Sequence, residues 1–161
     1  MSRLSVELAG PVHRSSVRVL YADTDTAGVV YYANYLRFFE LGRTELMRAW
    51  VVPAAELEAE GLILPVVECY CRYKASAAYD DLVHIDTCLA QIRDVACRFH
   101  YRLTREKDGR LLAVGFTLHA AVDRAGKLTR LPAGIVARLQ AKCDQTATPL
   151  ASSLDRAQEH G

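Results

Sequence analysis

Residues 16–50 read SVRVLYADTDTAGVVYYANYLRFFELGRTELMRAW. Polar and apolar side chains alternate imperfectly from Ser16 to Tyr21, which predicts a strand. Turn and helix-capping residue types follow over 23–28. From about Ala33 to Trp50, apolar side chains recur at the spacing of one helical face, so we expect a long helix there. The face expected to be buried consists of Leu36, Phe39, Leu46, Met47 and Trp50.

Turn residues divide the rest of the chain into further elements. Pro53 ends the long helix, and a short helix is expected over 54–60, before Gly61. Strands are expected over 62–73, 82–92, 95–105 and 110–122. The Asp108-Gly109 dipeptide between the last two strands suits a tight hairpin turn. Residues 132–143 are typical of a closing helix with Pro132 at its first position.

This order of elements predicts the fold class. Consecutive strands joined by short turns form an antiparallel sheet, and the long helix must bury its apolar face against that sheet. We therefore expect an α+β fold in which a curved antiparallel sheet wraps around one long central helix. We expect residues 14–143 to form this domain and residues 1–13 to form an N-terminal arm. Residues 144–161 are polar and aperiodic, and we expect them to form a disordered tail.

The bulk composition excludes several classes of function. Of the 161 residues, 51% are hydrophobic and 24% are charged, which is typical of a globular domain. The formal net charge of +1 provides no overall field to attract nucleic acid or a membrane surface. The sequence contains neither a transmembrane segment nor a signal-peptide pattern, so we expect a cytoplasmic protein.

The cysteines and histidines predict neither a disulfide framework nor a metal site. The five cysteines are odd in number and include no Cys-x-x-Cys pair. The five histidines lack metal-ligand spacing, and we interpret them as structural residues. P-loop, dinucleotide-binding and Gly-x-Ser-x-Gly motifs are absent, so we expect no metal and no resident cofactor.

The strand-to-helix junction combines two carboxylates with the start of a helix. Asp23 and Asp25 lie just before the long helix, whose first amide N–H groups are unpaired and carry partial positive charge. Such a helix start can polarise a carbonyl, and a nearby carboxylate can attack that carbonyl or activate water. Asp and Thr before a helix are also ordinary capping residues, so the pattern alone leaves both interpretations open.

A resemblance to a known family adds to this pattern. The stretch Arg18–Tyr35, which includes the DTDTAG turn, and the following FELGRTE of residues 39–45 resemble the hotdog-fold acyl-CoA thioesterases. The similarity is to the 4-hydroxybenzoyl-CoA thioesterase family, in its Tol-Pal-associated acyl-CoA thioesterase branch. YKASAAYDD at 73–81 and Asp123 with Leu131-Pro132 match further markers, so the resemblance extends from about residue 14 to 140.

The resemblance implies a fold, an assembly and a set of catalytic residues. It implies a hotdog fold in which two chains pair side by side, as a homodimer or within a homotetramer, with active sites at their interface. Asp25 matches the family's catalytic aspartate, Tyr21 a tyrosine beside the site, and the Tyr32 amide the group that polarises the thioester carbonyl. Many members of the branch have histidine where this chain has Tyr32, so no histidine step is implied here.

The remaining polar residues have weaker assignments. Lys74, Arg72 and Arg130 are the candidates for the phosphates of coenzyme A, although each is equally typical of a solvated strand end. We expect structural roles for Asp23 and Asn34, as local hydrogen-bonding groups. Along the helix, ion pairs are expected within Glu40/Arg43 and Glu45/Arg48.

The expected activity is hydrolysis of acyl-CoA thioesters to free acid and CoA. Asp25 would act as the nucleophile, through a mixed anhydride, or as a general base on water, and the sequence favours neither route. Two other functions remain open. One is a hotdog dehydratase or hydratase acting on acyl thioesters, which would typically use a histidine that is missing near Asp25. The other is a non-catalytic module that binds an acyl carrier protein or an envelope complex.

Overall fold

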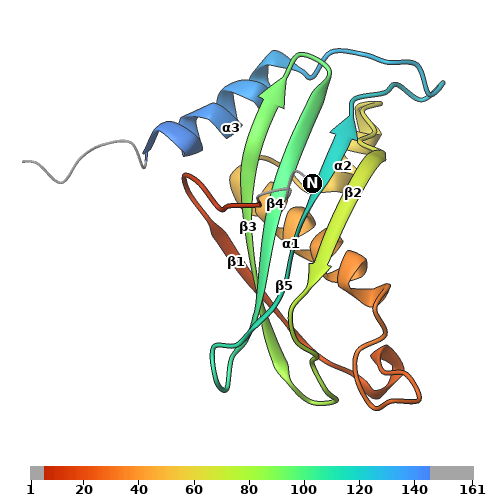
Figure 1. The fold of residues 1–161 in the computed structure, drawn as a ribbon. Coiled ribbons are helices and arrows are strands. Elements are labelled where there is room, and N and C mark those ends of the chain that lie inside the picture. Colours follow the sequence, from red (N-terminus) through yellow and green to blue (C-terminus); the bar gives the residue numbers. More distant parts are fainter. Residues whose placement is uncertain (1–5, 146–161) are drawn as a thin grey trace, which may run out of the picture.

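The computed structural model describes residues 6–145, which form one antiparallel sheet and three α-helices (Figure 1). The strands are β1 (His13–Arg18), β2 (Val66–Tyr73), β3 (Leu82–Arg93), β4 (Ala96–Arg105) and β5 (Leu111–Ala120). The helices are α1 (Asn34–Trp50), α2 (Ala54–Ala59) and α3 (Ala133–Gln145), with a short 3-10 turn, η1 (Tyr21–Asp23), after β1. Residues 1–5 of the expected arm and 146–161 of the expected tail lie outside the described residues.

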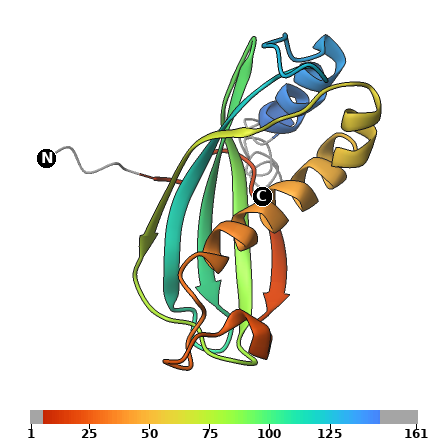
Figure 2. The same ribbon diagram turned by 90° about the vertical axis from the view of Figure 1, so that its right-hand side faces the viewer.

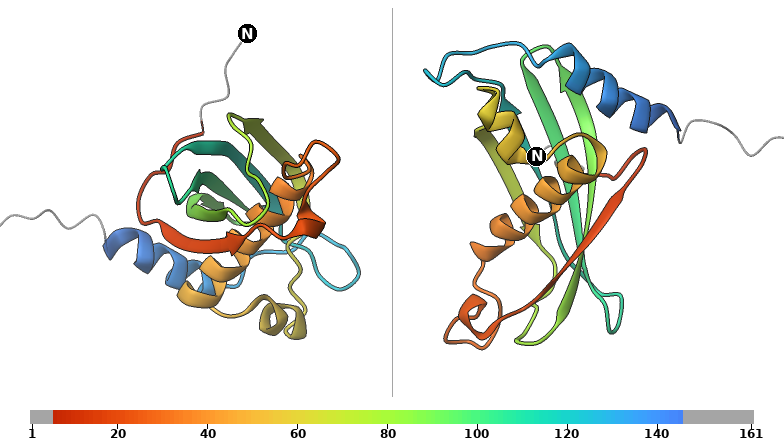
Figure 3. Two further views of the ribbon diagram at one scale, coloured as in Figure 1. Left: turned by 90° about the horizontal axis from the view of Figure 1, so that it is seen from below. Right: turned by 180° about the vertical axis from the view of Figure 1, so that it is seen from behind.

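The sheet has the strand order β1-β3-β4-β5-β2, and every neighbouring pair is antiparallel. The strands curve, and α1 lies along their concave side (Figures 2 and 3). β1 and β2 form the two edges of the sheet. The predicted α+β architecture, a curved antiparallel sheet around one long helix, is therefore confirmed.

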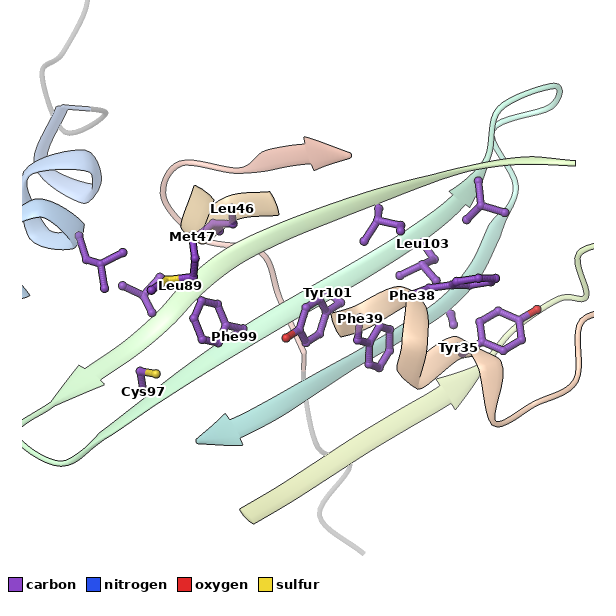
Figure 4. Packing of buried hydrophobic residues seen from close by; sticks show 14 of the residues in the cluster. Tyr35, Phe38, Phe39, Leu46, Met47, Leu89, Cys97, Phe99, Tyr101 and Leu103 are labelled. Carbon is purple, nitrogen blue, oxygen red and sulfur yellow. The ribbon is translucent and has the colours of Figure 1, made fainter. Parts of the chain in front are cut away.

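The buried face of α1 differs in part from the predicted one. Phe39, Leu46 and Met47 are buried as predicted, but Leu36 is 40% exposed and Trp50 is only partly covered. Tyr35 and Phe38 are buried instead, because the first turn of α1 packs beside the segment that contains Ala77. Aromatic rings pack beside aliphatic side chains in this core (Figure 4), and Phe39 stacks on Tyr101 with ring centroids 4.4 Å apart.

Gly115 on β5 marks the closest approach of helix and sheet. A Cβ atom at this position would overlap the carbonyl oxygen of Tyr70 on β2 and the ring of Phe39 on α1. The absence of a side chain therefore lets the Phe39 ring reach the sheet and lie flat on Tyr101.

A chain of polar side chains crosses the core between β4 and β5. The Tyr101 hydroxyl lies 2.6 Å from Thr117 Oγ1, and His119 Nε2 lies 2.8 Å from the same oxygen. His119 Nδ1 donates to the Leu64 carbonyl at 2.9 Å. If Tyr101 donates to Thr117 and Thr117 donates to Nε2, every group is satisfied with a neutral imidazole. His119 is fully buried, and this burial, together with the Arg43 charge, lowers its pKa to about 4.

The two ion pairs predicted along α1 have different outcomes. Arg48 Nε lies 3.4 Å from Glu45 Oε1, which confirms the predicted Glu45/Arg48 pair. Glu40 and Arg43 form no ion pair in the described part of the chain, where both line a cavity of about 180 Å³ between α1 and α2. Over residues 6–145, none of the helices combines the length and hydropathy that membrane crossing demands.

Candidate active site

The candidate site begins with a tight turn that presents Asp25. The Asp25 N–H donates to the Val29 carbonyl at 2.9 Å, and the Gly28 N–H donates to the Asp25 carbonyl at 3.0 Å. Ala27 N–H donates to Asp25 Oδ1 at 2.9 Å, which fixes the side chain at the turn. Gly28 closes the turn with φ +78°, a conformation that favours glycine. Within residues 6–145 the second carboxylate oxygen of Asp25 has no hydrogen-bond partner, and the residue is exposed.

Asp23, only two residues earlier, has the opposite environment. Its carboxylate is buried, accepts the Leu20 N–H at 2.8 Å, and receives Arg37 Nη1 at 3.1 Å. Its carbonyl oxygen accepts Asn34 Nδ2 at 2.9 Å. Asp23 and Asn34 thus make the local hydrogen bonds expected of structural residues, and they connect the turn to the start of α1.

The start of α1 leaves backbone donors available next to this turn. Tyr32 and Ala33 directly precede the helix, and neither of their N–H groups has an acceptor among the described residues. Unpaired amides at a helix start carry partial positive charge and suit a developing oxyanion. The Tyr32 carbonyl accepts the hydroxyl of Tyr73 at 2.9 Å, across from β2.

Asp25 and Tyr32 share one cavity of about 390 Å³. Tyrosine rings form part of its wall. Two of them, Tyr35 from α1 and Tyr73 from β2, contact each other with ring centroids 5.3 Å apart. The cavity is lined by Asp25, Val29, Val30, Tyr32, Tyr35, Tyr73, Lys74, Ala75 and Ser76. It therefore offers one carboxylate, one cation and three tyrosines among small and aliphatic residues.

Burial raises the pKa values of two phenols that line the cavity and of the nearby Cys71 thiol. Desolvation raises the pKa of the Tyr35 and Tyr73 phenols, and for Tyr73 the neighbouring Cys71 thiol adds to this effect. Desolvation also raises the pKa of Cys71 to about 11, so its thiol stays protonated at neutral pH. Among the residues that line this cavity, Asp25 is the group best suited to attack or proton abstraction.

The structure brings together three of the predicted site residues and separates the others. Asp25, Tyr32 and Lys74 line the same cavity. Tyr21 lies outside that lining, 79% exposed, with its ring edge-on to Tyr79 at 6.1 Å. Arg72 alternates with Tyr73 along β2 and so lies on the opposite face of the sheet.

α3 lies at the opposite end of the strands from the segment that follows β1 (Figure 1), and Arg130 lines a cavity beside α3. It lines a cavity of about 380 Å³ together with Arg93, Asp94 and the first turns of α3. Lys74 and Arg130 of one chain thus belong to different cavities. The roles given to Tyr21, Arg72 and Arg130 remain predictions.

Sequence reasoning missed Tyr35, Tyr73 and Arg93 as lining residues. Tyr73 was detectable, because it neighbours Lys74 in a recognised motif and alternates with Arg72 along a strand. Arg93 had no such signal, since its proximity to Arg130 depends on the packing of α3 against the end of β3. Over the described residues, no group of three or more His, Cys, Asp and Glu side chains is placed to hold a metal ion.

Comparison with known proteins gives consistent matches over most of the chain. The model of the thioesterase-like superfamily matches residues 19–139. The chain is 35% identical over 128 residues to Acyl-CoA thioester hydrolase YbgC of Escherichia coli, covering 79% of this chain and 95% of that protein. It is 30% identical over 115 residues to a putative esterase of Aquifex aeolicus, covering 71% and 88% respectively.

A solved structure shows the same fold. The hypothetical protein TT1821 from Thermus thermophilus superposes with a TM-score of 0.76 at 33% identity, covering 80% of this chain and 98% of that one. These matches confirm the hotdog fold and the family resemblance that the residues at 18–45 indicated.

Proposed function

We propose that this chain, which belongs to the thioesterase-like superfamily, hydrolyses acyl-CoA thioesters with Asp25 as its catalytic carboxylate. Similarity to a named acyl-CoA thioester hydrolase over nearly its whole length makes the chain an acyl-CoA thioesterase. One observation supports the assignment of Asp25 above all others. Asp25, whose second carboxylate oxygen has no hydrogen-bond partner within residues 6–145, lines the cavity that Tyr32 and Tyr35 also line.

The cavity supplies the two groups that the reaction needs. The thioester carbonyl is directed at the Tyr32 N–H, which stabilises the negative charge that develops on oxygen. In one route an Asp25 oxygen attacks the carbonyl carbon, the carbon–sulfur bond breaks, and CoA leaves as thiolate and takes a proton from water. Water then hydrolyses the mixed anhydride and restores Asp25. In the other route Asp25 removes a proton from water as the water oxygen attacks the carbonyl carbon. The carbon–sulfur bond then breaks, CoA leaves as thiolate, and the proton held by Asp25 passes to the sulfur, which restores the carboxylate.

The basic residues at the two ends of the sheet support a binding mode that spans two copies of the chain. Lys74 lies beside Asp25, whereas Arg130 and Arg93 line the cavity at the far end. A homodimer that places the far end of one chain against the near end of the other would let these cations bind the phosphates of one CoA. Arg72, on the outer face of β2, is the third phosphate candidate.

The edge strand β2 supports such pairing. β2 is an eight-residue edge strand, and Val66, Val67 and Tyr73 along it are exposed. An exposed apolar edge is a template for pairing with another strand. Sedimentation velocity should therefore give the mass of a dimer or of a pair of dimers, and a monomer at micromolar concentration would contradict the shared site.

The central test is a CoA-release screen over short, medium, long and aromatic acyl-CoAs, with wild-type protein and the Asp25→Asn variant. Asn retains the side-chain oxygen that accepts the Ala27 N–H and removes the charge. We expect kcat to fall roughly 1000-fold or more, as for loss of a group acting directly on the reacting atoms. The free energy of unfolding should change little, because the exposed carboxylate forms no ion pair among the described residues.

Asp123→Asn is the matched control. Asp123 Oδ1 accepts the Ala125 N–H at 2.9 Å, in a turn of the same kind as that of Asp25. Asp123 lies outside the lining of the 390 Å³ cavity, so its variant should retain wild-type kcat within twofold. Near-full turnover by Asp25→Asn would refute the assignment. Conversion of 3-hydroxyacyl or enoyl thioesters without CoA release would favour a dehydratase or hydratase.

A further inference from the structure

The first turn of α1 lacks the regular hydrogen bonds of an α-helix. Leu36 N–H donates to Ala33 at 3.2 Å, a bond that spans three residues rather than four. The Tyr32 carbonyl, which Leu36 would engage in a regular α-helix, has only a long backbone bond of 3.4 Å from the Tyr35 N–H. The peptide that joins Tyr32 to Ala33 is therefore weakly held by the backbone alone.

A side chain from the sheet provides the stronger bond. The Tyr73 hydroxyl, on the last residue of β2, donates to the Tyr32 carbonyl at 2.9 Å. Its ring is held edge-on by two neighbours, with centroids 6.4 Å from the Tyr32 ring and 5.3 Å from the Tyr35 ring. This packing limits the positions that the hydroxyl can reach, so the bond is directed by the fold.

The bond affects the groups on which the proposed chemistry depends. The two peptides that meet at Tyr32 carry the Tyr32 and Ala33 N–H groups, which have no acceptor within residues 6–145. A hydrogen bond to a carbonyl fixes the plane of its peptide and polarises the N–H on the other side. Tyr73 therefore fixes the Tyr32–Ala33 peptide and increases the positive charge at the helix start.

We propose that Tyr73 is a positioning residue: by holding the Tyr32 carbonyl it fixes Tyr32 through the Tyr32–Ala33 peptide, and so keeps the Tyr32 N–H of the preceding peptide directed at the oxyanion. The inference rests on the proposed hydrolysis at Asp25 and assigns a role to the hydroxyl of Tyr73. Its ring contributes to the cavity wall in any case. The hydroxyl is a donor at neutral pH, and burial raises the pKa of Tyr73 further above its ordinary value of 10.

The test is the Tyr73→Phe variant, which removes the hydroxyl and keeps the ring. We expect kcat for the best acyl-CoA to fall about tenfold, the effect of losing one hydrogen bond in the transition state. KM should stay within twofold of wild type, because the substrate loses no direct contact. Tyr70→Phe is the matched control, since Tyr70 lies on the same strand with its ring stacked on Phe116, and it should retain wild-type kinetics.

A spectroscopic readout follows the bond independently of turnover. Labelling with carbonyl-¹³C tyrosine and ¹⁵N alanine marks only the Tyr21–Ala22 and Tyr32–Ala33 peptides, because the sequence contains two Tyr-Ala pairs. In Tyr73→Phe the Tyr32 carbonyl signal should move upfield while that of Tyr21 stays in place. A merely structural ring contact would move neither this signal nor kcat.

The outcomes separate this inference from the proposed function. Wild-type kcat in Tyr73→Phe, or a rise in KM at constant kcat, would overturn the positioning role even if Asp25→Asn is inactive. Conversely, if Asp25→Asn equals wild type, the assignment of Asp25 fails. A shifted Tyr32 carbonyl together with a tenfold lower kcat would then still support the role of Tyr73 at the helix start.

Discussion

Two turns of this molecule share a sequence pattern and a backbone geometry. Asp25 and Asp123 each begin an Asp-x-Ala-Gly segment, and each carboxylate accepts the Ala N–H at 2.9 Å. The backbone bonds that close the two turns are equivalent, and the glycines have φ of +78° and +77°. Isolated bridges flank both turns, between Thr24 and Val30 and between Val122 and Leu128. Locally, the two aspartates are nearly indistinguishable.

Their surroundings are different. The Asp25 turn leads to an open cavity and to helix-start amides that have no acceptor in residues 6–145. The Asp123 turn follows β5, whose His119 belongs to a sealed chain in which every polar group can be paired. The same five-residue turn thus lies beside unpaired donors in one place and satisfied ones in the other. A turn motif gains chemistry only from what the fold brings next to it.

The largest effect on stability is expected from acid, which protonates His119 in the buried hydrogen-bond chain of β5. The folded state holds the pKa of His119 near 4, below its ordinary value of 6.5, so the unfolded chain binds a proton that the folded chain does not. Stability is therefore fully present above pH 6.5 and is lost as the pH falls toward 4, by about 3 kcal/mol.

The His119→Gln variant provides the control, because Gln can hydrogen-bond but does not titrate. Urea unfolding at pH 7 and pH 4 should show that the wild type loses about 3 kcal/mol more than the variant. Parallel losses in the two proteins would mean that His119 does not couple protonation to folding.

Matched glycine substitutions in the Asp25 and Asp123 turns should have an intermediate effect on stability and distinguish the two turns by their effect on kcat. Gly28→Ala and Gly126→Ala each place a Cβ at positive φ where no other atom lies within 4 Å, so the strain is purely that of the backbone. Each should lower the free energy of unfolding by about 1–2 kcal/mol. Only Gly28→Ala should also lower kcat, about tenfold, because only that turn places a catalytic carboxylate. Equal kcat values for the two variants would contradict the proposal that only the Asp25 turn positions a catalytic carboxylate.

The smallest effect is expected at the Tyr32 side chain. The Tyr32→Phe variant keeps the backbone amide, and within residues 6–145 the Tyr32 hydroxyl forms no hydrogen bond to Asp25. We expect kcat to fall no more than about threefold, which corresponds to less than 1 kcal/mol. A loss of a hundredfold in steady-state CoA release would show that the phenol itself takes part in proton transfer.

Most of the fold was predictable because it depends on local patterns. Strand alternation, turn dipeptides and helical spacing placed every α-helix and strand within a few residues of its observed bounds. The face of α1 was predicted less well, since Leu36 and Tyr35 are adjacent and either could begin the apolar stripe. The packing against the segment around Ala77 selects Tyr35, and the local sequence does not encode that contact.

The site divides in the same way. Asp25 and the Tyr32 amide were predictable because they belong to one continuous segment with a recognisable resemblance. The bond from Tyr73 to Tyr32 and the cavity shared by Arg93 and Arg130 join residues far apart in the chain. The buried His119 chain was not predicted either, since its acceptor is a backbone carbonyl at Leu64, on another segment.

Gly115 has a consequence for how this enzyme tolerates sequence drift. A methyl group there would push apart the Tyr70 backbone and the Phe39 ring, so either β2 or α1 would have to shift. Tyr73 lies on β2 and Tyr32 lies two residues before the start of α1, so the bond between them would stretch. A small substitution at Gly115 would thus lower kcat without changing any residue that lines the cavity. Inspection of the cavity residues alone would not reveal the cause.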